Sequence, residues 1–377
     1  MRILIIENII YIIYIYEMGI KNLKKIIKAK APGGISMINP YERFKNTKIA
    51  IDLNSYLYKF VYNSHNKTSN QYLKDLTDMI YQFLLYNITP IFVFDGKPSE
   101  AKNITLDLRK QATDQKKDKI SNSINNIKKY FKMDIESMDL KDLSIEIEKL
   151  LSTNEDLSAA DINLINDNLS EITKNHKNII KMTNEIYLNV EKLFKLWSVP
   201  YLKAKGEADF LCAKLYIDGI ISAVCSEDMD LLPHGVGHLI TGINSLDLKK
   251  TGETTLYTLD IILGEMEFTM EQFIDLCILA GCDYCDTIKN VGGMKGFQLL
   301  KQYKKIENIP GTKDDFIKAR DEFIKSKLEI YDLDIINFKI NINSNILVEF
   351  LTTETTFKKS TVTNKLTKLS GMGFTII

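Results

Sequence analysis

Two short apolar runs, KIAIDL at residues 48–53 and PIFVFD at residues 90–95, each carry an aspartate at or next to their end. Their β-branched and aromatic residues are typical of buried strands. Between them, residues 72–86 repeat apolar side chains at helical spacing. A strand, a helix and a second strand in this order predict a parallel sheet.

The same alternation resumes downstream. Residues 207–218 form a helical pattern, and the apolar run IISAVC at residues 220–225 predicts a third strand that ends at an acidic stretch. The intervening residues 113–185 are rich in Lys, Asn, Asp and Glu, which predicts exposed helices rather than a second packed core. We therefore expect an α/β fold with a central, mostly parallel sheet, helices on both faces and a helical insertion.

The second half of the chain predicts a small helical module. Residues 270–281 read as a helix stopped by Gly281, and a turn with a glycine pair leads into another helix that ends near residue 303. Beyond about residue 345 the pattern assigns no element.

Composition sets the class of protein but not its partner. The 377 residues are 45% hydrophobic and 26% charged, which is typical of a folded globular chain. Lys plus Arg equals Asp plus Glu at 49 each, so any affinity for DNA must come from local segregation of charge. The five cysteines lie mostly in apolar runs and indicate reduced intracellular thiols. Cys282 and Cys285 have CxxC spacing without a second Cys or His pair, so spacing alone supports neither a zinc site nor a redox role.

Seven carboxylates are candidates for one site. Ligands of open α/β sheets bind beyond the carboxyl ends of the strands, and acids follow all three predicted strands there, with others at the start of a helix and after Gly281. The seven are Asp52, Asp95, Glu207, Asp209, Asp228, Asp230 and Asp283. If they converge, their repulsion requires cations, and carboxylate oxygens suit a pair of Mg²⁺ or Mn²⁺ ions. Two such ions about 3.5–4 Å apart support phosphodiester hydrolysis. Taken singly, each acid is more typical of a turn, a helix cap or a solvated loop than of a metal site.

Basic residues and glycines offer further candidates. Lys102 and Arg109 are seven residues apart, so on a helix both face the same way and can hold a scissile phosphate. The alternative is a solvated basic face. Gly292 and Gly293 can turn backbone N–H groups toward a phosphate, directly or through a monovalent cation such as K⁺, or can simply form a tight turn.

Six motifs occur together in one order. They are MGIKNLKKIIKAKAP (18–32), IAIDLNSYLYKF (49–60), PIFVFDGKP (90–98), VPYLKAKGEAD (199–209), SEDMDLL (226–232) and LAGCDYCDTIKNVGG (279–293). In this order they resemble the flap endonuclease branch of the structure-specific 5′ nuclease family, from about residue 18 to about residue 309.

The resemblance implies a role for each candidate. One metal ion would be surrounded by Asp52, Asp95, Glu207 and Asp209, and the other by Asp228, Asp230 and Asp283. Lys102 and Arg109 would be the catalytic basic pair at the foot of a helical arch. The residues expected on the substrate side are Tyr58, which would stack on a base, Glu207, Gly281, Asp283 and Gly292.

The resemblance also implies how the chain is divided. Residues 1–17 would be an upstream extension, because relatives begin with Met-Gly as at Met18-Gly19, and this apolar run is too short to span a membrane comfortably. The further divisions are an N-terminal nuclease region (18–113), a helical arch (114–170), an internal nuclease region with a helix–turn–helix-like element that binds DNA (171–303) and a C-terminal extension (304–377).

The implied function is a metal-dependent DNA nuclease. It would be a 5′ flap endonuclease with 5′–3′ exonuclease activity on branched DNA with a free 5′ flap, in replication and repair. We expect a soluble, intracellular monomer without the C-terminal motif that docks on a sliding clamp. Two positions depart from the family: Gly292-Gly293-Met294 replaces its glycine-proline-lysine turn, and Asp209 stands where eukaryotic relatives have glutamate.

Three alternatives remain open from the sequence. They are a non-catalytic relative that binds branched DNA, a sister exonuclease or junction resolvase, and a phosphohydrolase of small phosphate esters.

Overall fold

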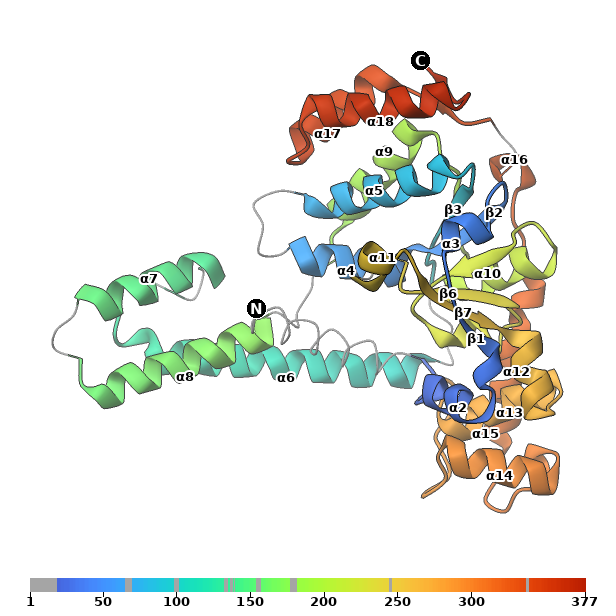
Figure 1. Ribbon diagram of the computed structural model, residues 1–377. Coiled ribbons are helices and arrows are strands. Elements are labelled where there is room, and N and C mark those ends of the chain that lie inside the picture. The colour runs from blue at the N-terminus through green and yellow to red at the C-terminus, as the bar shows by residue number, and fades with distance from the viewer. Residues whose placement is uncertain are drawn as a thin grey trace.

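A seven-stranded sheet forms the centre of the protein, in the order β1-β7-β6-β5-β2-β3-β4 (Figure 1). The computed structural model describes residues 19–64, 70–97, 102–131, 135, 138, 140–153, 157–176, 182–243, 246–336 and 339–377. The strands are β1 (Ile35–Ile38), β2 (Lys48–Asp52), β3 (Thr89–Phe94), β4 (Tyr201–Lys203), β5 (Ala223–Cys225), β6 (His238–Thr241) and β7 (Thr254–Thr258). Strands β2 to β6 pair in parallel, and β7 runs antiparallel to β6 and β1. The expectation of a mostly parallel sheet is confirmed.

Helices cover both faces of this sheet, as the sequence predicted. Successive strand residues point to opposite faces, so Ile49 and Ile51 pack in one apolar cluster and Ala50 packs in the other. One face is covered by α4 (Leu53–Ser64), α5 (Gln71–Leu85) and α9 (Asn184–Trp197), and α17 (Ser344–Glu354) and α18 (Lys359–Gly371) pack on the outside of this layer. The other is covered by α2 (Leu23–Lys30), α10 (Ala208–Ile217), α12 (Leu259–Met266), α13 (Met270–Ala280), α14 (Gly293–Tyr303) and α15 (Asp314–Ile324).

Shorter elements complete the described chain. They are α3 (Pro40–Arg43), α11 (Leu246–Thr251), α16 (Leu333–Ile336), η1 (Pro32–Gly34), η3 (Met229–Leu231), η4 (Ile306–Asn308) and η5 (Lys325–Leu328). Strand β5 is shorter than the predicted run 220–225, because Ile220 still lies in the turn that closes α10: its N–H donates to the Leu215 carbonyl at 3.0 Å. Residues 1–17, the expected upstream extension, lie outside the described residues.

The predicted insertion is a pair of long helices and a shorter one. Helices α6 (Asn103–Lys128), α7 (Leu140–Thr153) and α8 (Ala159–His176) extend away from the sheet as an arm (Figure 1). The expectation that it lacks a packed core was wrong. Its sparse apolar residues recur at helical spacing, as in the pair Leu143 and Ile147, and bury one another in a small separate cluster with Ile165 and Ile172.

The C-terminal residues, to which the sequence pattern assigned no element, pack on α5 and α9. There α17 and α18 lie beside a two-stranded parallel sheet of β8 (Asn341–Ile342) and β9 (Thr375–Ile376). In the described part of the chain, no helix is both long and apolar enough to cross a bilayer.

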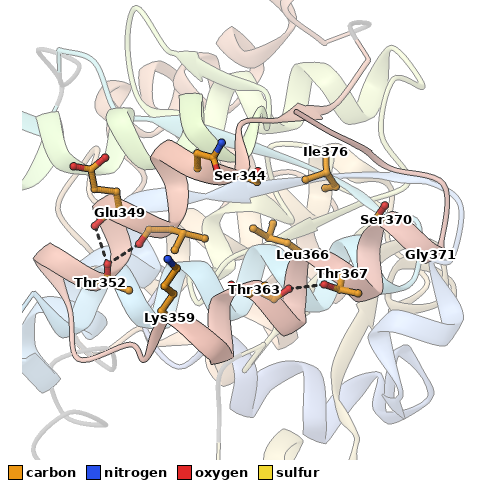
Figure 2. Close-up of a pocket in the computed structure, with 12 residues that line it drawn as sticks. Ser344, Glu349, Thr352, Lys359, Thr363, Leu366, Thr367, Ser370, Gly371 and Ile376 are labelled. Atoms are coloured by element: carbon orange, nitrogen blue, oxygen red, sulfur yellow. Dashed lines mark hydrogen bonds between the residues drawn. The ribbon is translucent and has the colours of Figure 1, made fainter.

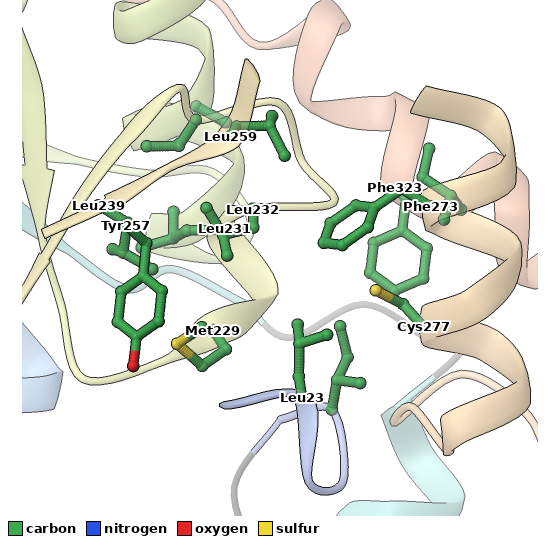
Figure 3. Packing of buried hydrophobic residues seen from close by; sticks show 14 of the residues in the cluster. Leu23, Met229, Leu231, Leu232, Leu239, Tyr257, Leu259, Phe273, Cys277 and Phe323 are labelled. Atoms are coloured by element: carbon green, nitrogen blue, oxygen red, sulfur yellow. The ribbon is translucent and has the colours of Figure 1, made fainter. Parts of the chain in front are cut away.

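The acidic loop after β5 is held in place by apolar neighbours of its acids. Met229, Leu231 and Leu232 are buried in the larger cluster, together with Leu23 of α2 and Phe273 of α13 (Figure 3). Burying side chains of this size stabilises the fold by roughly 1.5–3 kcal/mol each. The loop conformation that presents Asp228 and Asp230 is therefore fixed by the core.

The module of α13 to α15 is joined by one buried ion pair. Arg320 of α15 donates from Nε (2.9 Å) and Nη2 (2.7 Å) to Oδ1 of Asp275 on α13, and its Nη1 donates to Glu307 at 2.7 Å. The second Asp275 oxygen accepts the Ile306 N–H at 3.2 Å. The side chain of Asp275 is only 1% exposed, so it depends on these donors.

We predict that Arg320→Met lowers the free energy of unfolding by about 3–5 kcal/mol, because it leaves a buried carboxylate without its cation. Urea denaturation measures this. The matched control is Lys318→Met on the same helix, whose pair with Asp315 is largely exposed and should add little. Equal losses for the two variants would contradict this view of the junction.

Candidate active site

The sheet brings acids from separate parts of the chain to one rim. Asp52 is the last residue of β2, Asp95 follows β3, and Asp228 and Asp230 lie in the loop after β5. Because these three strands are neighbours and parallel, their carboxyl ends meet at the same edge. The sequence predicted this placement from strand order alone.

Ser226 connects two of these acids. Its buried hydroxyl donates to Oδ2 of Asp52 at 2.7 Å and accepts the Asp228 N–H at 3.0 Å. The Asp228 carboxylate in turn accepts the Asp230 N–H at 3.0 Å. One serine thus fixes the spacing between the end of β2 and the acidic loop.

Helix α10 is placed by Asp95. Oδ1 of Asp95 accepts the N–H of Ala208, the first residue of α10, at 2.7 Å, while the Asn54 amide donates to Oδ2. A carboxylate at this position is favoured by the helix dipole. As a result, Glu207 at the N-cap and Asp209 in the first turn face the same rim.

The start of the described chain is packed directly against the acids. The Ile20 N–H donates to Oδ1 of Asp230 at 2.7 Å. Gly19 has φ +73°, and a Cβ there would lie 2.3 Å from an Asp228 oxygen and 2.6 Å from an Asp230 oxygen. Only glycine fits this position without displacing the carboxylates.

Lys102 lies among the acids. Its Nζ is hydrogen-bonded to Oε2 of Glu207, is 3.8 Å from Oδ2 of Asp283, and sits 5.3 Å from the centre of the Tyr284 ring. Burial opposes its charge, but Glu207, Asp230 and Asp209 outweigh that cost and raise the pKa of Lys102. The ammonium is therefore a cation that partly balances the rim.

One lysine does not neutralise seven carboxylates. Burial, followed by the charge of Asp95, raises the pKa of Asp52 to about 7. Burial and the neighbouring Asp228 raise the pKa values of Asp209 and Asp230 well above the usual range for aspartate. These shifts show that the acids are close enough to repel one another.

The donor set fits hard divalent cations. Oε1 of Glu207 and Oδ2 of Asp230 are buried and have no hydrogen-bond partner in the described part of the chain. Within the same residues, no three side chains already surround a single point suitable for a metal ion. In the structure the carboxylates of Glu207, Asp95 and Asp52 accept hydrogen bonds from Lys102, Asn54 and Ser226, respectively. Oxygen-rich, charged and partly unpaired, the rim suits Mg²⁺ or Mn²⁺.

The other predicted residues lie around this rim or further out. Gly281 ends α13 at φ +110° and accepts the Lys21 N–H at 3.0 Å, two residues before Asp283. Tyr58 is on α4 and is 36% exposed. Arg109 is in α6, but its side chain is outside the described part of the structure.

The two glycines of the turn before α14 differ. Gly292 is exposed, and a Cβ there would meet nothing within 4 Å. A Cβ on Gly293 would lie 2.0 Å from Cδ1 of Ile26, so Gly293 is required by the packing of α14 on α2. Only Gly292 is placed to meet a ligand from solvent.

Sequence reasoning missed the residues that position the acids. Ser226 and Asn54 were inside the quoted motifs but received no role, and Tyr284 was not singled out. Their signal was weak, because a small polar residue beside an acid is common in loops.

A separate pocket of about 940 Å³ lies between α17, α18 and β9 (Figure 2). Two of its hydroxyls are used within their own helices: Thr352 donates to the carbonyl of Val348 and Thr367 to that of Thr363. Glu349 and Lys359 are the charged residues among those that line it. The acidic rim brings together more charged side chains than this pocket, so we place the functional site at the rim.

Known proteins share both the sequence and the fold. The XPG N-terminal domain matches residues 18–116 and the XPG I-region matches residues 198–283. Flap endonuclease 1 of Entamoeba histolytica is 30% identical over 373 residues, covering 94% of this chain and 88% of that protein. Flap endonuclease 1 of Theileria parva is 30% identical over 368 residues, and there the chain spans 65% of the relative's length.

Solved structures with the same fold include flap endonuclease-1 from Methanococcus jannaschii, with a TM-score of 0.59 at 20% identity over 89% of this chain and 95% of that one. The catalytic core of Rad2 in complex with DNA substrate gives a TM-score of 0.60 at 16% identity over 93% of this chain and 100% of that one. At these identities the structures establish the fold, and the sequence matches establish the family. This chain belongs to the flap endonuclease family.

Proposed function

We propose that this chain is a structure-specific 5′ flap endonuclease with 5′–3′ exonuclease activity, which hydrolyses DNA phosphodiesters with two divalent metal ions. The observation that carries the proposal is the rim itself, where acids at the ends of three neighbouring strands and at a helix N-terminus meet, and where Glu207, Asp209 and Asp230 act on the ammonium of Lys102. Family membership supports the same activity.

The carboxylates divide into two sets. Asp52, Asp95, Glu207 and Asp209 would hold one Mg²⁺, and the remaining acids, Asp228, Asp230 and Asp283, would hold the other. Bound there, divalent ions supply a water of lowered pKa and offset the negative charge that develops on the phosphate. Ser226 would keep the two sets in register, because its hydroxyl contacts members of both.

Lys102 has a second task in this scheme. Once cations balance the acids, its ammonium no longer needs Glu207 and can donate to an oxygen of the scissile phosphate. Its position at the N-cap of α6 places it where the arm meets the sheet. Arg109, seven residues later on α6, would hold the same phosphate.

The substrate would be branched DNA with a free 5′ flap. The arm of α6 to α8 exposes Lys117, Lys128 and Lys129, which can guide a single strand toward the rim. Tyr58 would stack on a base beside the cut, and the turn at Gly292 would hold the duplex through its backbone, directly or through K⁺. We further propose that the protein acts as an intracellular monomer at sites of DNA replication.

We predict Mg²⁺-dependent incision near the branch of a 5′-labelled double-flap DNA, by the full chain and by a form that begins at Met18. EDTA and Asp228→Ala should each abolish incision, because EDTA removes the metal ions and the substitution removes one of the carboxylates proposed to hold them. Asp315→Ala, an exposed acid on α15, is the matched control and should cut normally.

The products of this assay separate the remaining functions. Tight flap binding without metal-dependent incision would reject the nuclease and favour a DNA-binding relative. Cutting confined to DNA ends or to four-way junctions would assign the chain to a sister activity.

We also predict that Ser226→Ala lowers the free energy of unfolding in EDTA by about 1–3 kcal/mol, because it leaves the buried Asp52 without its hydroxyl donor. It should also raise the Mg²⁺ concentration needed for half-maximal incision. Ser226→Thr keeps the hydroxyl, so its Mg²⁺ requirement should match that of the parent protein, although the added methyl group at this fully buried position costs stability of its own. An alanine variant with unchanged stability and unchanged metal dependence would show that Ser226 does not position the acids.

A further inference from the structure

The cysteine pair in the loop after α13 is left unused by the proposed function. Sγ of Cys282 lies 3.8 Å from Sγ of Cys285, and both side chains are partly buried. The sequence spacing alone gave no role to these thiols, but the structure shows them facing each other.

We propose that Cys282 and Cys285 are a reversible oxidation site, and that the disulfide between them switches the active site off. A disulfide requires a separation of about 2.05 Å, so the sulfurs need to approach by only about 1.75 Å. The proposal that this bond forms rests only on the positions of the two sulfurs. Its effect on incision rests on the proposed function.

The oxidant would be a peroxide. One thiol attacks a peroxide oxygen, the O–O bond breaks, and a sulfenic acid and one water form. The second thiol then displaces the hydroxyl group, which leaves as water, and the S–S bond closes. Both sulfurs are oxidised, hydrogen peroxide is reduced to two waters, and a dithiol reductant reverses the bond by exchange.

These two cysteines are also more accessible to an oxidant than the other three cysteines of the chain. Cys212, Cys225 and Cys277 are buried, whereas Cys282 and Cys285 are partly exposed. A structural zinc ion would need two more Cys or His ligands, and the described residues bring none to this loop. A two-cysteine oxidation site therefore accounts for the geometry better than a metal.

The two residues inside the loop carry the effect to the active site. Asp283, between the cysteines, lies 3.8 Å from Nζ of Lys102, and the Tyr284 ring packs under the same ammonium at 5.3 Å. Drawing the sulfurs together turns the short backbone segment that holds both side chains. Mutating residues that support metal ligands typically lowers metal affinity or activity by about 10–100-fold. A small shift of Asp283 and Tyr284 is therefore expected to weaken Mg²⁺ binding measurably.

The test starts with the full chain, reduced and then treated with hydrogen peroxide. Mass spectrometry should show a loss of two hydrogens confined to the peptide with residues 282–285. The oxidised protein should incise flap DNA at least about tenfold more slowly and need at least about tenfold more Mg²⁺ for half of its thermal stabilisation. Dithiothreitol should restore both.

Two variants control for other oxidation. Cys285→Ser and Cys282→Ser each keep one thiol and cannot form the bond, so both should respond to Mg²⁺ as the reduced protein does, before and after peroxide. If either variant loses its Mg²⁺ response after peroxide as the parent does, an oxidation other than the disulfide is responsible and the switch is rejected.

Two further results would overturn the proposal. The first is no bond under conditions that oxidise a free peptide of the same four residues. The second is a bond that leaves the Mg²⁺ response unchanged. The mass measurement and the thermal stabilisation by Mg²⁺ do not depend on incision, so they test the cysteine pair even if the reduced protein does not cut flaps. Failure of the reduced protein to cut flaps would reject the proposed function alone.

Discussion

Repulsion among buried carboxylates is the constraint on which the rest of this structure depends. Asp52, Asp209 and Asp230 all have raised pKa values, because each is buried beside other acids. Such an arrangement is costly unless a cation balances it. Lys102 partly fills that need. The fold also holds the acids in place through hydrogen bonds such as that from Ser226 to Asp52, and through the burial of Met229 and Leu231 on either side of Asp230.

A site that is costly without cations is well suited to bind them. The side chains that donate to the carboxylates include an ammonium, an amide and a hydroxyl, and in the proposed function the ammonium turns from the acids to a phosphate. The same lysine also connects the rim to the arm, because its side chain contacts the acids and its backbone forms the N-cap of α6. Cys282 and Cys285 flank Asp283 and Tyr284, which contact the same lysine. The proposed oxidation site therefore lies next to the charges that the lysine balances.

Much of this arrangement could be predicted from the sequence. The period of the apolar residues gave β2, β3, α5, α10 and α13 within a few residues, and parallel pairing then required Asp52, Asp95 and Asp228 to share an edge. The contacts that orient these acids could not be read in the same way. Lys102 and Glu207 are 105 residues apart, Ser226 and Asp52 174, and Ile20 and Asp230 210, so no local pattern encodes them. The small core of the arm was missed because its isoleucines and leucines are sparse among polar residues.

The most direct test of the central claim is anomalous diffraction from crystals of the protein soaked in Mn²⁺. The account predicts two manganese peaks at the carboxyl ends of β2, β3 and β5, with the Lys102 ammonium moved away from Glu207. Crystals without manganese at the rim, in which Lys102 still pairs with Glu207 at saturating Mn²⁺, would contradict it.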